Sequence, residues 1–89
     1  MPEGGFDVPK FMDIHHGMVG ITPEALKAAH EGDLAIQGEE GVSFDHAWAD
    51  PVSGTVFCIS TGPSADAIQR IHTRNGIPPA EIHEITMEV

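Results

Sequence analysis

The chain has few cysteines and no long apolar run, and each shortage excludes a class of protein. Its one cysteine, Cys58, cannot form an intrachain disulfide, and we expect it to be a small buried apolar residue. Neither a Cys-x-x-Cys pair nor a His-Glu-x-x-His motif is present, which argues against the usual zinc sites. No stretch approaches the roughly 20 apolar residues of a membrane span. Residues 1–9 do not resemble a signal peptide, so we expect a cytoplasmic protein without membrane contact.

Basic residues are scarce as well. Only Lys10, Lys27, Arg70 and Arg74 oppose fourteen acidic residues, so the net charge is −10. Such a surface repels phosphate backbones and attracts cations, so we expect no nucleic-acid partner. An acidic surface can also serve solubility alone.

What the chain does have is histidine. Six histidines are spread along the 89 residues: His15, His16, His30, His46, His72 and His83. Imidazole is the commonest protein ligand for first-row transition metals, and carboxylates complete such sites. The first hypothesis is therefore a metal-binding protein.

The hydrophobic pattern predicts a short leader at residues 1–8, expected to be flexible, and a single domain at residues 9–89. Strands are predicted at 10–16, 42–49, 55–61 and 80–89, and helices at 22–37 and 64–75. Thr22 and Ser64 are the expected helix caps. The order β-α-β-β-α-β predicts an α+β ferredoxin-like fold, an antiparallel sheet with both helices on one face.

The alternation within the strands does not by itself decide which face of the sheet meets the helices. We expect Met12 and Ile14 to face the helices. The opposite, open face would then carry two sets of side chains, namely Phe11, Asp13 and His15, and Phe44, His46 and Trp48. Exposed aromatic side chains in a row indicate a partner surface, so we expect a homodimer formed by two open faces.

Four segments carry a resemblance to a known family: 10–18 (KFMDIHHGM), 29–37 (AHEGDLAIQ), 46–51 (HAWADP) and 54–58 (GTVFC). They resemble the small actinobacterial nickel-binding ferredoxin-like proteins, formerly a domain of unknown function. The resemblance covers roughly residues 9–89. It implies a ferredoxin-like homodimer that binds nickel ions at the dimer surface, with a role in nickel sequestration or detoxification. Ligand choices rest on local chemistry instead.

The first candidate ligands lie on the first strand. Asp13 and His15 share a face two residues apart, a plausible strand-borne pair. His15 is as readily an open-face residue that forms a hydrogen bond at the dimer interface. His16 points to the opposite face and joins them only if the strand ends at His15. His16 is better explained as a hydrogen-bond donor that anchors the following loop than as a metal ligand.

The second candidates lie on the first helix. His30 and Asp33 are spaced i and i+3, so they share one surface patch that suits either a metal or a carboxylate that orients an imidazole. His46 lies among aromatics and could be a ligand, although an interface role is the commoner one. His72 lies on the apolar side of its predicted helix, near the C-terminal end. A structural role is favoured there over a role as a metal ligand.

Three functions remain open from the sequence. The first is a non-catalytic homodimer that buffers, sequesters or detoxifies nickel. The same side chains could also bind other divalent transition-metal ions. Its candidate metal ligands are His15, His16, His30, Asp33, Asp13 and His46. The second is a small ferredoxin-like enzyme of the monooxygenase or isomerase type with a histidine-aromatic cavity. The third is an interaction module without metal.

Overall fold

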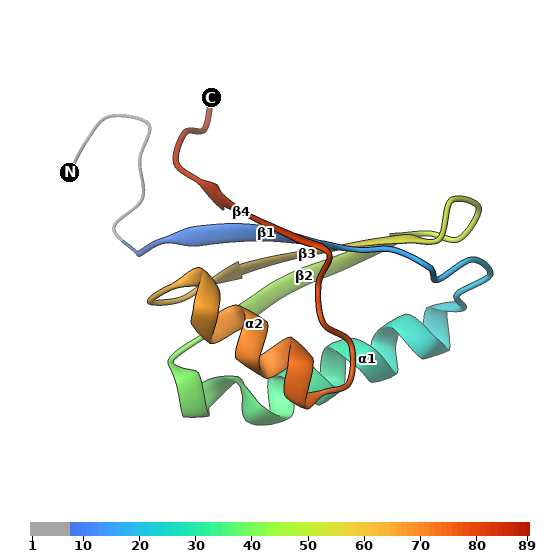
Figure 1. The fold of residues 1–89 in the computed structure, drawn as a ribbon, viewed down its shortest axis with the longest axis horizontal. Coiled ribbons are helices and arrows are strands. Elements are labelled where there is room, and N and C mark those ends of the chain that lie inside the picture. The colour runs from blue at the N-terminus through green and yellow to red at the C-terminus, as the bar shows by residue number, and fades with distance from the viewer. Residues whose placement is uncertain (1–7) are drawn as a thin grey trace.

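The computed structural model describes residues 8–89, and most of the expected leader at residues 1–8 lies outside this range. Its elements run in the order β1 (Lys10–His15), α1 (Pro23–Ile36), a 3₁₀ turn η1 (Gln37–Glu40), β2 (Ser43–Asp50), β3 (Thr55–Thr61), α2 (Ala65–Arg74) and β4 (Glu81–Ile85). The strands form one antiparallel sheet in the order β2-β3-β1-β4, and both helices lie on the same side of it (Figure 1). The predicted ferredoxin-like arrangement is confirmed.

Both helices begin at the expected capping residues. The side chain of Thr22 accepts a hydrogen bond from the amide of Ala25 at 3.1 Å, and the side chain of Ser64 accepts one from Ala67 at 3.2 Å. Each cap satisfies an amide that has no partner within its helix. The segment after α1 stops at Gly41, whose φ of 68° is readily adopted only by glycine.

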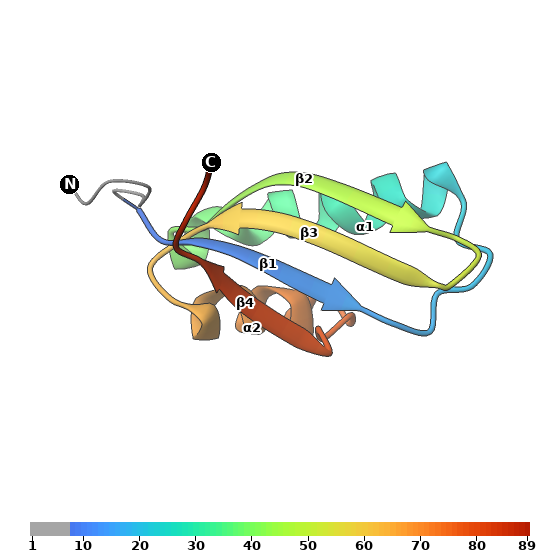
Figure 2. The same ribbon diagram turned by 90° about the horizontal axis from the view of Figure 1, so that it is seen from above.

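The core lies between the sheet and the two helices. Its buried members come from β1, from β2 with the residue that precedes it, and from α2: Phe11, Val42, Phe44, Ala67, Ile68 and Ile71. Figure 2 shows the four strands seen from above, with α1 beneath β2 and β3 and α2 beneath β4. No helix within residues 8–89 combines the length and apolar character needed to cross a bilayer.

The expected orientation of β1 is wrong. Phe11, Asp13 and His15 are the buried residues of this strand and face the helices, whereas Met12 and Ile14 are only half-buried on the open face. Periodicity identified the two sets correctly but not their sides. Apolar content suggested the wrong side because Asp13 and His15, the polar members of the inner set, form hydrogen bonds with each other, and Asp13 also with the buried His72.

The expected shared face of Phe44, His46 and Trp48 is also wrong. The pairing of β2 with β3 shifts between Phe44 and His46, which is an irregularity of the β-bulge type. One extra residue in a strand moves every later side chain to the other face. Phe44 is therefore buried in the core, while His46 and Trp48 lie exposed on the open face with their rings stacked at 5.4 Å.

The loop that follows β1 is fixed to the turn between β2 and β3. The amide of Met18 donates to the carbonyl of Gly54, and that of Gly20 donates to Pro51, both at 2.9 Å. Gly54 has a φ of 75°, and a Cβ at this position would come within 2.5 Å of the amide nitrogen of Val19. The close approach therefore requires glycine, and it holds the loop over one end of the sheet.

Candidate metal centre

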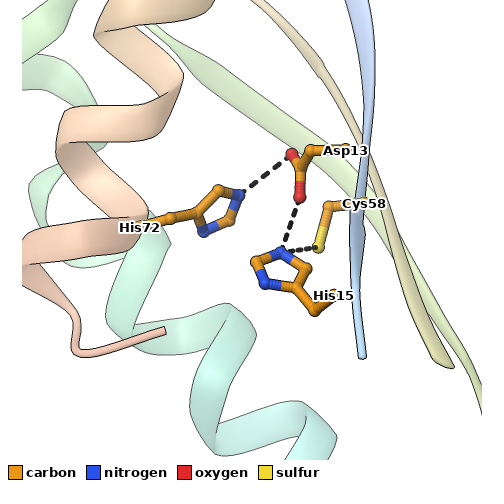
Figure 3. A group of neighbouring side chains, drawn as sticks. All are labelled: Asp13, His15, Cys58 and His72. Atoms are coloured by element: carbon orange, nitrogen blue, oxygen red, sulfur yellow. Dashed lines mark hydrogen bonds and ion pairs between the residues drawn. The ribbon is translucent and has the colours of Figure 1, made fainter. Parts of the chain in front are cut away.

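Four buried side chains with metal-binding atoms meet between the sheet and α2. Asp13 and His15 come from β1, Cys58 from β3 and His72 from α2 (Figure 3). One donor atom from each residue can be chosen so that all four lie within 4.8 Å of one another. The four side chains are between 0% and 6% exposed.

Sheet pairing and helix periodicity bring these residues together. Asp13 lies directly opposite Cys58 in the pairing of β1 with β3, so both side chains point to the helices. His15 follows two residues later on the same face of β1. His72 lies one position after the core residue Ile71 and four after Ile68, and all three are buried.

Hydrogen bonds link the site into a chain of alternating carboxylates and imidazoles. Asp13 accepts from Nε2 of His15 at 2.6 Å and from Nε2 of His72 at 3.0 Å. The other nitrogen of His72, Nδ1, lies 3.2 Å from a carboxylate oxygen of Asp33 on α1. Since ionised carboxylates only accept hydrogen bonds, His72 carries a proton on both nitrogens when both carboxylates are ionised.

The electrostatics follow from this arrangement. Burial lowers the pKa of His72, but the hydrogen bonds to Asp13 and Asp33 outweigh burial and raise the pKa to about 9. Burial likewise raises the pKa of Asp13, yet the hydrogen bonds from His15 and His72 hold it below its ordinary value. Burial and the charge of Asp13 raise the pKa of Cys58, so the free chain holds it as a thiol.

The donor set fits a transition-metal ion. Two imidazole nitrogens, a carboxylate oxygen and a sulfur form a mixed site of the kind bound by nickel, zinc or copper. Ligands about 2.0–2.3 Å from a shared ion stand at most about 4.6 Å apart, so a small contraction of the 4.8 Å group suffices. Asp33, on the far nitrogen of His72, would orient that ring as a second carboxylate, which is how metal-bound histidines are usually held.

A small cavity of about 20 Å³ adjoins the cluster between α1 and the sheet. His15, Cys58, His72 and Asp33 line it, together with His30 of α1 and several apolar side chains. A volume of this size holds about one water molecule or an ion. An organic substrate, which the enzyme alternative requires, does not fit into it.

Comparison with protein families now identifies the chain. The family model described as "Nickel responsive protein SCO4226-like" matches residues 11–85. The chain belongs to the SCO4226-like family. The crystal structure of SCO4226 from Streptomyces coelicolor A3(2) is similar at 52% sequence identity and a TM-score of 0.89, covering 90% of this chain and 99% of that one. Among curated proteins no match is found.

In this SCO4226-like chain, four of the six metal ligands predicted from the sequence border one site. Asp13 and His15 are in the four-residue cluster, Asp33 contacts its His72, and His30 lines the cavity beside it. The i, i+3 spacing of His30 and Asp33 thus places both on the inner side of α1, although no hydrogen bond between the two is found.

The other two predicted ligands lie elsewhere. His16 is exposed after β1, with its Nε2 3.6 Å from Glu81, which also lies 3.2 Å from Nε2 of His83. His46 is exposed on the open face beside Trp48. The structure therefore brings neither His16 nor His46 to the buried cluster.

Sequence reasoning assigned two cluster members to other roles. Cys58 was predicted to be a buried apolar residue and His72 a structural residue of the helix stripe, and both are indeed buried. The signal that could have joined them to Asp13 was the pairing of β1 with β3. That register depends on which strands are neighbours, which a single sequence does not specify.

Proposed function

We propose that this SCO4226-like protein binds nickel and sequesters it without catalysis, in the reducing cytoplasm. Asp13, His15, Cys58 and His72 hold the ion, and other divalent transition metals compete for the same donors. The observation that carries the proposal is the convergence of four buried donor atoms within 4.8 Å on a strongly acidic chain. Membership in a family of nickel responsive proteins supports the choice of nickel.

Metal binding at this cluster exchanges protons for the ion. The ion would take the place of the proton on Nε2 of His72 and of the thiol proton on Cys58, because only the deprotonated forms are ligands. The proton that His15 donates from Nε2 to Asp13 would move to its unpartnered Nδ1, which frees Nε2 for the ion. Nδ1 of His72 keeps its proton toward Asp33. Affinity therefore falls as the pH is lowered, and the bound ion replaces the positive charge that His72 supplies between the two carboxylates of the free chain.

Replacement of Cys58 by serine tests the site directly. Nickel bound by the wild-type chain will produce a thiolate-to-nickel absorption band in the near ultraviolet, with one ion per chain at saturation. We expect Cys58→Ser to abolish the band and to weaken binding about 100-fold or more, since a neutral hydroxyl replaces an anionic ligand. The measurement is a nickel titration followed by absorbance and calorimetry.

His46→Ala is the matched control, because it removes an exposed imidazole far from the cluster. It should leave the band and the affinity unchanged. A wild-type chain that binds nickel without a thiolate band, or a Cys58→Ser variant of undiminished affinity, would place the ion on other residues and refute the proposed site.

The functional unit that we propose is a homodimer formed through the open sheet face. The half-buried side chains of Met12, Ile14, Phe57 and Ile59 share this face with Trp48, which is 49% exposed. A second copy of the chain would cover this apolar surface with the same surface of its own.

Light scattering should give twice the chain mass, and Ile14→Lys should return the mass of a monomer. A monomeric wild-type chain would contradict the dimer.

A further inference from the structure

The strand pattern of the sequence continues beyond the end of β4. Alternation predicts a strand over residues 80–89, but β4 ends at Ile85. The four residues that follow, here called the arm, alternate between polar and apolar side chains as in a strand with one apolar side: Thr86, Met87, Glu88 and Val89. All four are exposed, and Met87 keeps 76% of its side chain accessible to water. The apolar side of the arm is therefore uncovered in the single chain.

The neighbouring strand β1 offers the arm no partner within the chain. Ile85 lies opposite Lys10, the first residue of β1, so further pairing would fall on Pro9. Proline has no amide hydrogen to donate, and the carbonyl of Pro9 already accepts a hydrogen bond from the amide of Gly62 at 3.1 Å. Pairing of β4 with β1 therefore stops at Ile85, and the strand-like pattern of the arm is not used by its own sheet.

The arm leaves the sheet on the side of the open face. Ile85 shares this face with its partner Lys10, and alternation in an extended arm puts Met87 and Val89 on the same side. In Figure 1 the segment after β4 rises from the sheet on the side away from both helices, and Figure 2 shows it at one end of the sheet.

The arm is too short to cover the open face of its own chain. Four residues span at most about 14 Å, whereas the eight residues of β2 extend over about 26 Å. The open face and the arm are thus two apolar surfaces of one chain that do not cover each other.

The distribution of charge makes a second copy the partner that fits both surfaces. Two chains that each carry a net charge of −10 repel each other except where acidic side chains are few. Among the paired strand positions of the open face, acidic side chains occur only at one end, at Asp50 and Glu81. The arm emerges at the other end, beside Lys10. A second copy can therefore approach the face and the arm without acidic side chains at the centre of the contact.

We propose that, in the homodimer, the arm of each copy lies on the open face of the other. The inference rests on the proposed dimer and adds the element that holds it together. Met87 and Val89 pack against the apolar side chains of the second sheet, while Thr86 and Glu88 face water. Two-fold symmetry makes the contact reciprocal, so each interface contains two arms.

Replacement of Met87 by aspartate tests the arm through the dissociation constant of the dimer, measured by light scattering over a dilution series of the full chain. Each dimer loses two buried methionine side chains, and each contributes about tenfold, so we expect the dissociation constant to rise about 100-fold. Ala28→Asp is the matched control, because it adds the same charge at an exposed apolar side chain of α1, on the other side of the sheet. Its dissociation constant should stay within about twofold of the wild type.

A mixed sample of isotope-labelled and unlabelled wild-type chains shows where the arm lies, independently of any substitution. We expect nuclear Overhauser effects between the methyl group of Met87 in one chain and open-face side chains of the other. Effects confined to one chain would overturn the proposal, because the arm would then fold back on its own sheet.

A dimeric wild-type chain with an unchanged dissociation constant in Met87→Asp would overturn the arm and leave the proposed dimer standing. A monomeric wild-type chain would refute the dimer itself, and with it the arm. The two failures are thus distinguished by the mass of the wild type, and circular dichroism verifies that both variants fold.

Discussion

Replacement of Asp13 by asparagine should lower the free energy of unfolding of the metal-free chain by about 3 kcal/mol. The carboxylate is fully buried and accepts hydrogen bonds from both His15 and His72. Asparagine keeps the shape and one acceptor but removes the charge that stabilises the buried imidazolium of His72. Removal of one partner from a buried ion pair costs about 3–5 kcal/mol.

The lower end of this range applies because His72 can lose its proton. A pKa of about 9 instead of 6.5 corresponds to about 3 kcal/mol of net stabilisation of protonated His72, which Asp13 and Asp33 produce together against the effect of burial. For a chain of this size the loss corresponds to a decrease in melting temperature of roughly 12–24 °C. Urea denaturation in the presence of a chelator measures it.

Asp45→Asn is the matched control. Asp45 is exposed on β2, and among residues 8–89 its carboxylate accepts a hydrogen bond only from the side chain of Ser43, at 3.1 Å. The same chemical change there should alter the free energy of unfolding by less than about 0.5 kcal/mol. Equal effects at the two positions would show that the buried network contributes no special stability.

The stability of the metal-free chain should fall as the pH rises from about 6.5 to 9. The pKa of His72 is higher in the folded chain, about 9, than the 6.5 of a free imidazole. The folded state therefore holds this proton more tightly, and the resulting stability is complete below pH 6.5 and is lost as the pH rises through 9. About 3 kcal/mol is involved, and most of it should be gone by pH 8.5.

Urea denaturation in a series of buffers from pH 5 to 8.5 tests this decrease. The upper limit keeps the contribution of Cys58 small, because an unfolded cysteine is only half ionised at about pH 8.5 and its raised pKa in the folded chain lowers the stability mainly above that pH. Asp13→Asn should show a flatter profile, whereas His83→Ala, which removes an exposed imidazole, should keep the wild-type slope. A wild-type profile that is flat from pH 5 to 8.5 would rule out an ionised His72 between two carboxylates.

The order of the elements could be predicted because local signals determine it. Thr22 and Ser64 cap the two helices as expected, and Gly41 ends the segment after α1. The sides of the sheet could not be predicted in this way. Asp13 and His15 look like solvent-facing residues until His72, the partner of Asp13 on α2, is known. A bulge after Phe44 has no mark in the sequence.

The candidate site was predictable in part for the same reason. The pairs Asp13 with His15 and His30 with Asp33 are each local, two or three residues apart, so periodicity alone places each pair on one face. Cys58 and His72 join them only through pairing of β1 with β3 and packing of α2 on the sheet, with separations of 45 and 59 residues from Asp13. Contacts over such distances follow from the tertiary fold, not from a local pattern.

An anomalous-scattering map at the nickel absorption edge, from crystals of the nickel-loaded protein, tests the central claim most directly. The buried cluster predicts one strong peak per chain, surrounded by Asp13, His15, Cys58 and His72. The competing position is the exposed group in which Glu81 lies 3.6 Å from His16 and 3.2 Å from His83. A peak there, with none between β1, β3 and α2, would contradict the account.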